Sequence, residues 1–324
     1  EHVSHLLLFS LEMDEAGHIV ATDRLPRKDL MVLARAATRR HGSQLMLCFG
    51  GNGRSGGFSR MVGASARRKL FLDELIAMLD ELDLDGVDYN WEYPGYAFGR
   101  GYLSEDEIRK DYSGLSRLIK ETKLLFLSGT RPRTVTMAYY PDTRQEQLIK
   151  DYKLDKYVDM MHMMTYDQSG AQHSSMELAT KSITQGKHVL PADKLTLGLP
   201  FYGRHSHTGD WTTFEDLVQR HAPLDPHFDS VEAPSSSWRH GQGPATIGFN
   251  GASTIELKTR HALQAGIAGV MIWEVGQDCR LVPVTHGSTT HVRTCPSDNS
   301  SLLLSITRAI VTEGFDKRQS RNEL

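Results

Sequence analysis

The sequence has no long apolar run and little net charge. No stretch of its 324 residues approaches the roughly 18 apolar residues of a membrane-spanning helix, so we expect no membrane span. The formal net charge of −3 gives no electrostatic reason to expect nucleic acid or an anionic membrane as a partner. With 39% hydrophobic and 24% charged residues, the composition is typical of a soluble globular protein.

Cysteine is also scarce. Of the three, Cys48 lies in an apolar run and is expected to be a buried thiol, while Cys279 and Cys295 flank a polar loop and can pair. Three cysteines do not prove an oxidising compartment. The 15 histidines are scattered, without the spacing of a zinc site, and no glycine-rich stretch carries the lysine of a phosphate-binding loop. We expect no metal and no cofactor.

Three short features bear on cellular location. The sequence begins at Glu1 without a signal peptide, so we expect a processed chain or one cut from a longer protein. Residues 299–301 form a glycosylation sequon, and the ending Arg-Asn-Glu-Leu324 resembles a lumenal retention signal. An accidental ending on a disordered tail explains the second feature equally well. The expectation is a secreted protein or one in the secretory-pathway lumen.

Strand-like and helix-like segments alternate along the chain, which predicts a parallel α/β architecture. The expected strands lie at residues 3–10, 44–51, 84–93, 134–140, 158–166, 195–202 and 269–273. The expected helices lie at 29–40, 66–83, 105–127, 142–152, 176–187, 254–265 and 301–313. Leu30 and Leu33 belong to the expected apolar face of the first helix, and Ser104 with Glu107 predicts a capping box on the third.

The most informative stretch is residues 84–95. Alternation puts aromatic and apolar side chains on one strand face and two acids and an amide on the other, namely Asp88, Asn90 and Glu92. Such a buried row is costly unless that face lines a wet or functional cavity. Pro94-Gly95 then ends the strand, so Glu92 lies at its carboxyl tip, where parallel barrels carry catalytic residues. The alternative is an edge strand with a solvated polar face.

This stretch resembles the signature of glycoside hydrolase family 18, the chitinases and chitinase-like proteins. The family reads Asp-Gly-x-x-Asp-x-Asp-x-Glu, usually followed by Tyr-Pro, and the middle acid is Asn90 here. Four further segments are similar to family blocks in the family's order, at residues 48–51, 163–167, 198–203 and 269–274. The resemblance therefore covers nearly the whole chain.

The resemblance implies an α/β fold of the TIM (β/α)8 barrel type, as a single domain over residues 1–324. Residues 205–253 are then a loop or short insertion between strands seven and eight. Only seven strands are visible, and the signature lies on the third of them rather than on the fourth. We therefore expect the family's first strand to lie upstream of Glu1 and to be missing from this chain.

The resemblance also implies roles for individual residues. Glu92 is the acid and later the base, beside Asp88 and Asn90, and the substrate's own acetamido oxygen is the nucleophile. Tyr166 donates its hydroxyl to that oxygen. The implied substrate-binding residues are Asp167, Trp273, Met164, Tyr139, Phe9, Tyr202 and Arg204. Core packing for Trp273, a strand-end aromatic for Tyr166 and a turn cap for Asp167 remain alternatives. The catalytic residues, Asp167 and Trp273 are expected to converge in one pocket.

Two departures from the family affect the expected activity. Asn90 brings no negative charge, and losing a near charge costs about 2–4 kcal/mol in the rate barrier. Cys48 replaces a serine that backs the acid row, and the amide of Asn90 is expected to donate to Asp88. The leading expectation is a chitinase-type hydrolase of modest turnover acting on chitin or chito-oligosaccharides. The alternatives are a non-hydrolytic chitinase-like lectin and an inhibitor or scaffold.

Overall fold

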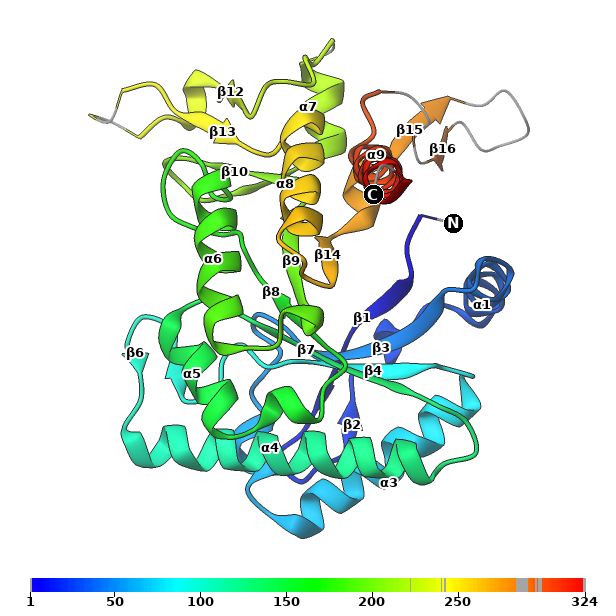
Figure 1. The fold of residues 1–324 in the computed structure, drawn as a ribbon. Helices are drawn as coiled ribbons and strands as arrows, with labels where there is room; N and C mark the ends of the chain where they lie inside the picture. The colour runs from blue at the N-terminus through cyan, green and yellow to red at the C-terminus, as the bar shows by residue number, and fades with distance from the viewer. Residues whose placement is uncertain are drawn as a thin grey trace. The chain divides into compact units, whose positions relative to one another are not determined.

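The computed structural model describes residues 2–221, 223–239, 241, 243–283, 291–294, 296 and 299–322. These residues form two compact units (Figure 1). The first comprises Val3–His162 and Val189–Lys194, and the second comprises Met163–His188 and Leu195–Leu324. Cys295 and the last two residues of the tail lie outside the described residues, and with them the expected pairing of Cys279 with Cys295 and the end of the retention signal.

The first unit is built around a sheet with the strand order β8-β7-β4-β3-β1-β2. Its strands are β1 (His5–Met13), β2 (Ile19–Val20), β3 (Gln44–Gly50), β4 (Gly86–Asn90), β7 (Thr134–Tyr139) and β8 (Met160–Met163). Strands β1, β3, β4 and β7 pair in parallel, and β2 pairs antiparallel with β1. Since β4 pairs with β3 on one side and β7 on the other, the edge-strand alternative for the signature is wrong.

Helices of the first unit cover the outward side of these strands. They are η1 (Thr22–Arg24), α1 (Lys28–His41), α2 (Phe58–Val62), α3 (Ser65–Glu81), α4 (Glu105–Ser128), α5 (Thr143–Asp151), η2 (Leu154–Lys156) and η3 (Ala192–Lys194). A short hairpin, β5 (Tyr96–Ala97) and β6 (Gly101–Tyr102), follows the signature. The capping box of Ser104 and Glu107 is confirmed at the start of α4.

The apolar face expected for α1 is wrong. Leu30 and Leu33 are 45% and 65% exposed, and the buried residues of this helix are Met31 and Thr38. The reason is an ion pair, because Arg35 donates to both carboxylate oxygens of Asp85 just before β4. A bidentate arginine–carboxylate pair adds geometric specificity to its strength, so this contact helps to fix the rotation of the helix.

Side chains alternate along β4 between two faces, one packed against helices and the other turned away from them. Tyr89 points toward α4, where its hydroxyl lies 2.8 Å from the hydroxyl of Thr122, and Trp91 stacks on Phe58 of α2 at 4.9 Å. Figure 1 shows α3 and α4 running along this side of the strands. Because successive residues of a strand face opposite sides, Asp88 and Asn90 face the other way, inside the curve of the sheet.

The second unit combines two parallel strands with helices and a small antiparallel sheet. Strands β9 (Leu195–Pro200) and β14 (Gly269–Trp273) pair in parallel. The helices are α6 (Met176–Val189), α7 (Phe214–Arg220), η4 (Ser235–Ser237), α8 (Ala252–Gln264), η5 (Val275–Asp278) and α9 (Leu302–Asn322). Strands β15 (Arg280–Pro283) and β16 (His291–Thr294) form a separate pair.

The segment 205–253 holds regular structure. Strands β11 (Trp211–Thr213), β12 (Ser230–Glu232) and β13 (Thr246–Gly248) join β10 (Tyr202–His205) in a sheet of order β11-β10-β13-β12. Helix α7 follows β11 directly, and Thr213 caps it by accepting from the backbone N–H of Asp216. The segment is therefore a small α+β element rather than an extended loop.

All seven strands expected from the sequence are present, as β1, β3, β4, β7, β8, β9 and β14.

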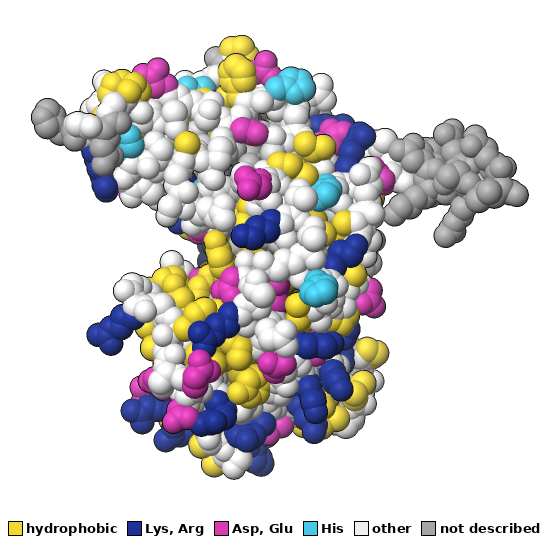
Figure 2. Space-filling model, turned by 60° about the vertical axis from the view of Figure 1, so that its left-hand side comes forward, with side chains coloured by type: hydrophobic (Ala, Val, Ile, Leu, Met, Phe, Trp, Pro, Cys, Tyr) yellow, Lys and Arg dark blue, Asp and Glu magenta, His cyan; other side chains and the backbone are white. Residues whose placement is uncertain are grey.

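Among the described residues, no helix combines the length and the apolar character needed to cross a bilayer. Figure 2 shows positive and negative side chains interspersed over the visible face, without a large area of one sign. This agrees with the small net charge of the sequence.

Candidate functional site

The β4 polar row consists of Asp88, Asn90 and Glu92. Asp88 and Asn90 are 3% and 8% exposed, and Glu92 is half-buried just past the end of the strand. The parallel register puts Cys48 of β3 and Thr136 of β7 beside Asp88. The hydroxyl of Thr136 donates to Oδ1 of Asp88 at 2.6 Å, and the thiol of Cys48 donates to Oδ2 at 3.2 Å.

Asn90 contacts Glu92 rather than Asp88. Its Nδ2 donates to Oε1 of Glu92 at 3.1 Å, so the expected amide bond to Asp88 is wrong. The two oxygens of Asp88 accept instead from Cys48 and Thr136 on the neighbouring strands. Among the described residues the buried Oδ1 of Asn90 has no hydrogen-bond partner. An unpaired buried acceptor costs about 1–3 kcal/mol, which a ligand N–H at this atom offsets.

A glycine loop after β3 frames the backbone of the polar row. Gly50 has φ of 99°, and a Cβ there would lie 2.3 Å from the carbonyl oxygen of Asn90. The N–H of Gly51 donates to that same oxygen at 2.7 Å, and the N–H of Glu92 donates to Oγ of Ser55 at 3.0 Å. Sequence reasoning missed Ser55, although its place just after the Gly-Gly block marks it as part of the same loop.

The groups nearest Asp88 are uncharged. Burial, reinforced by the neighbouring Asp88 carboxylate, raises the pKa of the Cys48 thiol well above its ordinary value. His162 of β8 lies with Nε2 3.8 Å from Oδ1 of Asp88, and burial lowers the pKa of this imidazole. Cys48 therefore remains a thiol donor and His162 a neutral ring near physiological pH. Sequence reasoning missed both Thr136 and His162, because their contact depends on strand register.

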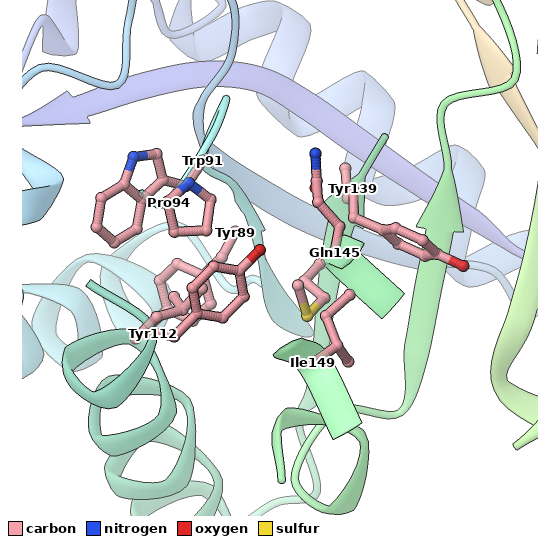
Figure 3. Close-up of a pocket in the computed structure, with 10 residues that line it drawn as sticks. Tyr89, Trp91, Pro94, Tyr112, Tyr139, Gln145 and Ile149 are labelled. Atoms are coloured by element: carbon pink, nitrogen blue, oxygen red, sulfur yellow. The ribbon is translucent and has the colours of Figure 1, made fainter. Parts of the chain in front are cut away.

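The structure separates Tyr139 from the polar row and places Phe9 near it. Tyr139 is 1% exposed and lines a small cavity with Tyr89 and Trp91, on the outward face of the sheet (Figure 3). Its hydroxyl donates to Oε1 of Glu146 on α5 at 3.5 Å. Phe9 lies against the glycine loop, because a Cβ on Gly51 would fall 2.4 Å from its ring.

The second unit holds the Asp167 cluster, which joins three expected site residues, Asp167, Tyr202 and Arg204, with His173. Oδ1 of Asp167 accepts from the hydroxyl of Tyr202 at 2.6 Å and from Nε of Arg204 at 2.9 Å. Burial, with Asp167 adding to it, raises the pKa of Tyr202 well above its ordinary value, so the phenol stays a donor. Asp167 itself has φ of 64°, a left-handed conformation that aspartate tolerates better than most residues.

His173 and Trp211 support this cluster, and sequence reasoning missed both. Nδ1 of His173 accepts from the backbone N–H of Asp167 at 3.3 Å, and Nε2 contacts the carbonyl oxygen of Tyr202 at 3.2 Å. Burial lowers the pKa of His173 to about 4, so the ring is neutral and Nε2 is the donor. Trp211 stacks on Tyr202 at 4.5 Å with 19° between the planes, and the guanidinium of Arg204 lies 5.1 Å from the indole.

The remaining expected residues also lie in the second unit. The ring of Tyr166 lies 6.2 Å from that of Tyr202 at 72°, so Tyr166 adjoins the Asp167 cluster. Gly198 makes room for it, since a Cβ there would lie 2.9 Å from the tyrosine ring. Met164 is 5% exposed, and Trp273 is half-buried at the carboxyl end of β14, opposite Pro200 in register.

Chemically, the polar row offers the carboxyl group of Glu92 beside the amide of Asn90, an arrangement that suits acid–base catalysis. The Asp167 cluster offers a carboxylate, a phenol and a guanidinium, which suit hydrogen bonds to a polyhydroxylated ligand. Within the described residues, no group of three or more His, Cys, Asp or Glu side chains is arranged to hold a metal ion.

Comparisons with known proteins agree with these features. The family model described as Glycosyl hydrolases family 18 matches residues 1–278. An endochitinase of Manduca sexta is 22% identical over 283 residues, covering 68% of this chain and 48% of that protein. The chain thus spans about half the length of this curated relative.

Two solved structures have a similar fold. A chitinase from Bacteroides thetaiotaomicron has a TM-score of 0.71 at 19% identity, covering 97% of this chain and 90% of that chain. The chitinase-like agglutinin of Robinia pseudoacacia has a TM-score of 0.65 at 20% identity, covering 95% and 93%. At these identities the likeness concerns the fold, and it confirms the α/β class of the TIM (β/α)8 barrel type.

Proposed function

Because the chain belongs to glycosyl hydrolase family 18, we propose that it is a chitinase-type hydrolase that cleaves β-1,4-linked N-acetylglucosamine. The observation that carries this proposal is the geometry of Asn90. Its Nδ2 donates to Glu92 while its buried Oδ1 is unpaired among the described residues. An acetamido group supplies the N–H donor that this oxygen lacks, beside the carboxyl group of Glu92 to which Asn90 donates.

In the proposed reaction Glu92 gives its proton to the glycosidic oxygen as the bond to C1 breaks. The substrate's acetamido oxygen attacks C1 and forms an oxazolinium ion, so no protein nucleophile is required. Asn90 orients the acetamido group through Oδ1. Glu92, now a carboxylate, takes a proton from the water that attacks C1, and the ring opens to give a product with retained configuration.

The remaining expected residues have proposed binding roles that rest on the resemblance. Tyr166 donates its hydroxyl to the acetamido oxygen, and Asp167 accepts from a sugar hydroxyl. Tyr202 and Arg204 hold Asp167 in place through bonds of 2.6 and 2.9 Å. Trp273 stacks on the apolar face of the sugar. Met164 and Phe9 are proposed to line the sugar-binding surface.

The turnover should be modest. The oxazolinium ion is a cation, and Asn90 contributes a dipole in place of a negative charge. A near carboxylate is worth about 2–4 kcal/mol to such a cation, or roughly 10²–10³ in rate.

Hydrolysis of a fluorogenic chitotrioside tests the proposal. The wild-type chain should release the fluorophore, and Glu92→Gln should lose at least about 10²-fold in rate because the general acid is removed. Glu177→Gln is the matched control, since Glu177 is an exposed glutamate on α6. Absence of any wild-type turnover, or a Glu92→Gln rate equal to that of the wild type, would contradict the proposal.

A chitinase-like lectin is the second candidate. The neutral Asn90 and the thiol of Cys48 favour it, since both weaken the catalytic row while the Asp167 cluster keeps its charged groups. The fold likeness to the Robinia pseudoacacia agglutinin is compatible with it. Calorimetric binding of chitotriose by the wild-type chain, without product after prolonged incubation, would favour the lectin over the hydrolase.

We further propose that the protein is secreted or enters the secretory-pathway lumen. The sequon residue Asn299 is exposed in the structure, which a glycan requires. Expression in secreting eukaryotic cells should give a species whose mass falls on treatment with an N-glycosidase. The variant Asn299→Gln should show no such shift, and an unglycosylated wild-type product would count against the proposal.

A further inference from the structure

An aromatic cluster begins one residue after Glu92. It consists of the β5–β6 hairpin, residues 96–102, together with Tyr93 and Tyr140, and we call it the aromatic hairpin. The ring of Tyr93 lies 5.9 Å from that of Tyr96, 5.8 Å from that of Phe98 and 6.3 Å from that of Tyr140. Five aromatic rings in total gather here, because Tyr102 packs edge-on against Tyr96 at 5.5 Å.

The hairpin is anchored at its base. The hydroxyl of Tyr102 donates to the Asp142 carboxylate at 2.8 and 3.0 Å, and the guanidinium of Arg144 lies 4.4 Å from the Tyr102 ring. Asp142 also caps α5 by accepting from the backbone N–H groups of Arg144 and Gln145. Figure 1 shows β6 beside α5, in agreement with these contacts. The backbone turns at Gly99 and Gly101, both at positive φ.

This anchored structure presents one ring to solvent. Phe98 is 59% exposed at the turn of the hairpin, while Tyr93, Tyr96, Tyr102 and Tyr140 are half-buried around it. The ring therefore adds little to the core. The anchored hairpin holds this exposed ring in one place, where the face of a ligand can pack against it.

The chemistry of the cluster suits a pyranose ring. Such a ring has an apolar face of C–H groups, which packs on an aromatic ring, and polar edges, which bond to hydroxyl groups. Aromatic faces and tyrosine hydroxyls are both present in the cluster, and no acidic side chain contacts the exposed Phe98 ring in the described contacts. Because Tyr93 directly follows Glu92 and its ring lies 5.8 Å from that of Phe98, the cluster adjoins the proposed general acid along the chain.

We propose that the aromatic hairpin binds a sugar unit of a chito-oligosaccharide beyond those that flank the bond beside Glu92, with Phe98 as the stacking ring. The proposal rests on the proposed function and adds a determinant of chain-length preference. A substrate too short to reach Phe98 gains nothing from it, whereas a longer one binds more tightly.

The first experiment compares substrate lengths. Phe98→Ala should lower kcat/KM for chitohexaose roughly 3- to 10-fold, the range of one aromatic packing contact, and should change the rate on a fluorogenic chitobioside less than about twofold. Phe98→Trp should restore the value for chitohexaose because it keeps a stacking face. Phe228→Ala is the matched control, since Phe228 is 53% exposed in the second unit and should change neither substrate.

The second experiment separates the two proposals. In the Glu92→Gln background, calorimetry with chitohexaose should give measurable binding that Phe98→Ala weakens roughly 3- to 10-fold, with little dependence on salt. If Glu92→Gln binds chitohexaose and Phe98→Ala leaves the affinity unchanged, the inference is wrong while the proposed function stands. If the wild type neither binds nor cleaves chitohexaose, both fail.

A second copy of the chain is the alternative ligand for the exposed Phe98 ring. Sedimentation of the wild type and of Phe98→Ala measures whether the ring contributes to self-association. If the two proteins sediment equally and Phe98→Ala has lost the preference for longer substrates, the result supports sugar binding. A change of oligomeric state with unchanged sugar affinity would overturn the inference.

Discussion

The β4 polar row and the Asp167 cluster differ in the groups that contact their buried or half-buried aspartates. Asp88 accepts from a hydroxyl and a thiol, with a neutral imidazole 3.8 Å away, so no cation contacts it in the described residues. Asp167 accepts from a phenol and a guanidinium and lies partly in solvent. Each group has a buried histidine whose pKa is lowered by burial, His162 in the first and His173 in the second.

This difference suggests that the polar row serves the proposed catalysis and the Asp167 cluster the proposed sugar binding. The resemblance implies that Asn90 stands where the family has an acid and Cys48 where it has a serine, and both differences bear on the stabilisation of the proposed cationic intermediate. The Asp167 cluster keeps a charged acceptor with firm donors. We therefore expect substitutions in the polar row to change the rate of hydrolysis and those in the Asp167 cluster to change sugar affinity.

The largest effect is expected at Lys258, which supports the second unit from within. Its ammonium group is fully buried and donates to the carbonyl and hydroxyl oxygens of Ser174 and to Oδ1 of Asn250, at 2.7 to 2.8 Å. Lys258→Met leaves these acceptors unpaired and should lower the free energy of unfolding by about 3 kcal/mol. Chemical denaturation measures this, with the exposed Lys181→Met as control. A loss below about 1 kcal/mol would contradict the structural role.

The same residue predicts a pH dependence. Burial lowers the pKa of Lys258 to about 7, from an ordinary value of 10.5. Between these two values the unfolded chain binds more protons than the folded chain, so the contribution of Lys258 to stability rises with pH. The difference in unfolding free energy between the wild type and Lys258→Met should therefore increase from pH 7 to pH 9, and a flat or falling difference would show that the lysine stays charged when folded.

The next largest effect is expected at Asn90 in the polar row. Asn90→Asp should raise hydrolysis of the fluorogenic chitotrioside roughly 10-fold or more, because it places a negative charge beside the cationic intermediate. A second carboxyl group next to Glu92 also disfavours ionisation of the acid, so the alkaline limb of the pH–rate profile should move upward. An unchanged or lower rate would mean that Asn90 belongs to a differently adapted catalytic row.

A smaller effect is expected in the Asp167 cluster. Asp167→Asn keeps an oxygen that can accept from Tyr202 but removes the charge paired with Arg204, at a half-buried site. The affinity for chitotriose should fall about fivefold, since such ion pairs contribute about 1 kcal/mol. The maximal rate should change less than the affinity. Calorimetry and steady-state kinetics measure the two, and the reverse pattern would break the proposed separation of roles.

The smallest effect is expected at Cys48. Cys48→Ser replaces a weak thiol donor to Asp88 with a hydroxyl donor of similar size. The rate should rise about two- to threefold, within the range of one improved hydrogen bond. Combined with Asn90→Asp the gain should exceed the sum of the separate gains, because both residues belong to one network. A loss of activity would indicate that the serine does not fit this buried position.

Local sequence patterns predicted most elements of the fold. Strand β14 coincides with the expected residues 269–273, and α4 begins at the expected capping box. These segments carry strong local signals, namely β-branched residues, helical periodicity and a cap. The rotation of α1 was missed because it is fixed by the contact of Arg35 with Asp85, 50 residues away.

The candidate site was predictable only where a residue belongs to a motif. The signature gave Asp88, Asn90 and Glu92, but not which neighbour receives the amide of Asn90, since that depends on donors from β3 and β7. Trp211 lies in a segment whose composition suggested a loop, and only the pairing of β10 with β11 brings it onto Tyr202. Tyr139 was assigned to substrate binding from the resemblance, while alternation along β7 turns it to the outward face.

The stereochemistry of the product tests the central claim most directly. Proton NMR recorded during the first minutes of chitohexaose hydrolysis distinguishes the anomers before they equilibrate. Catalysis by Glu92 with the acetamido group as nucleophile predicts that the β-anomer appears first, since the configuration is retained. An initial α-anomer would show direct attack by water and contradict the proposed mechanism.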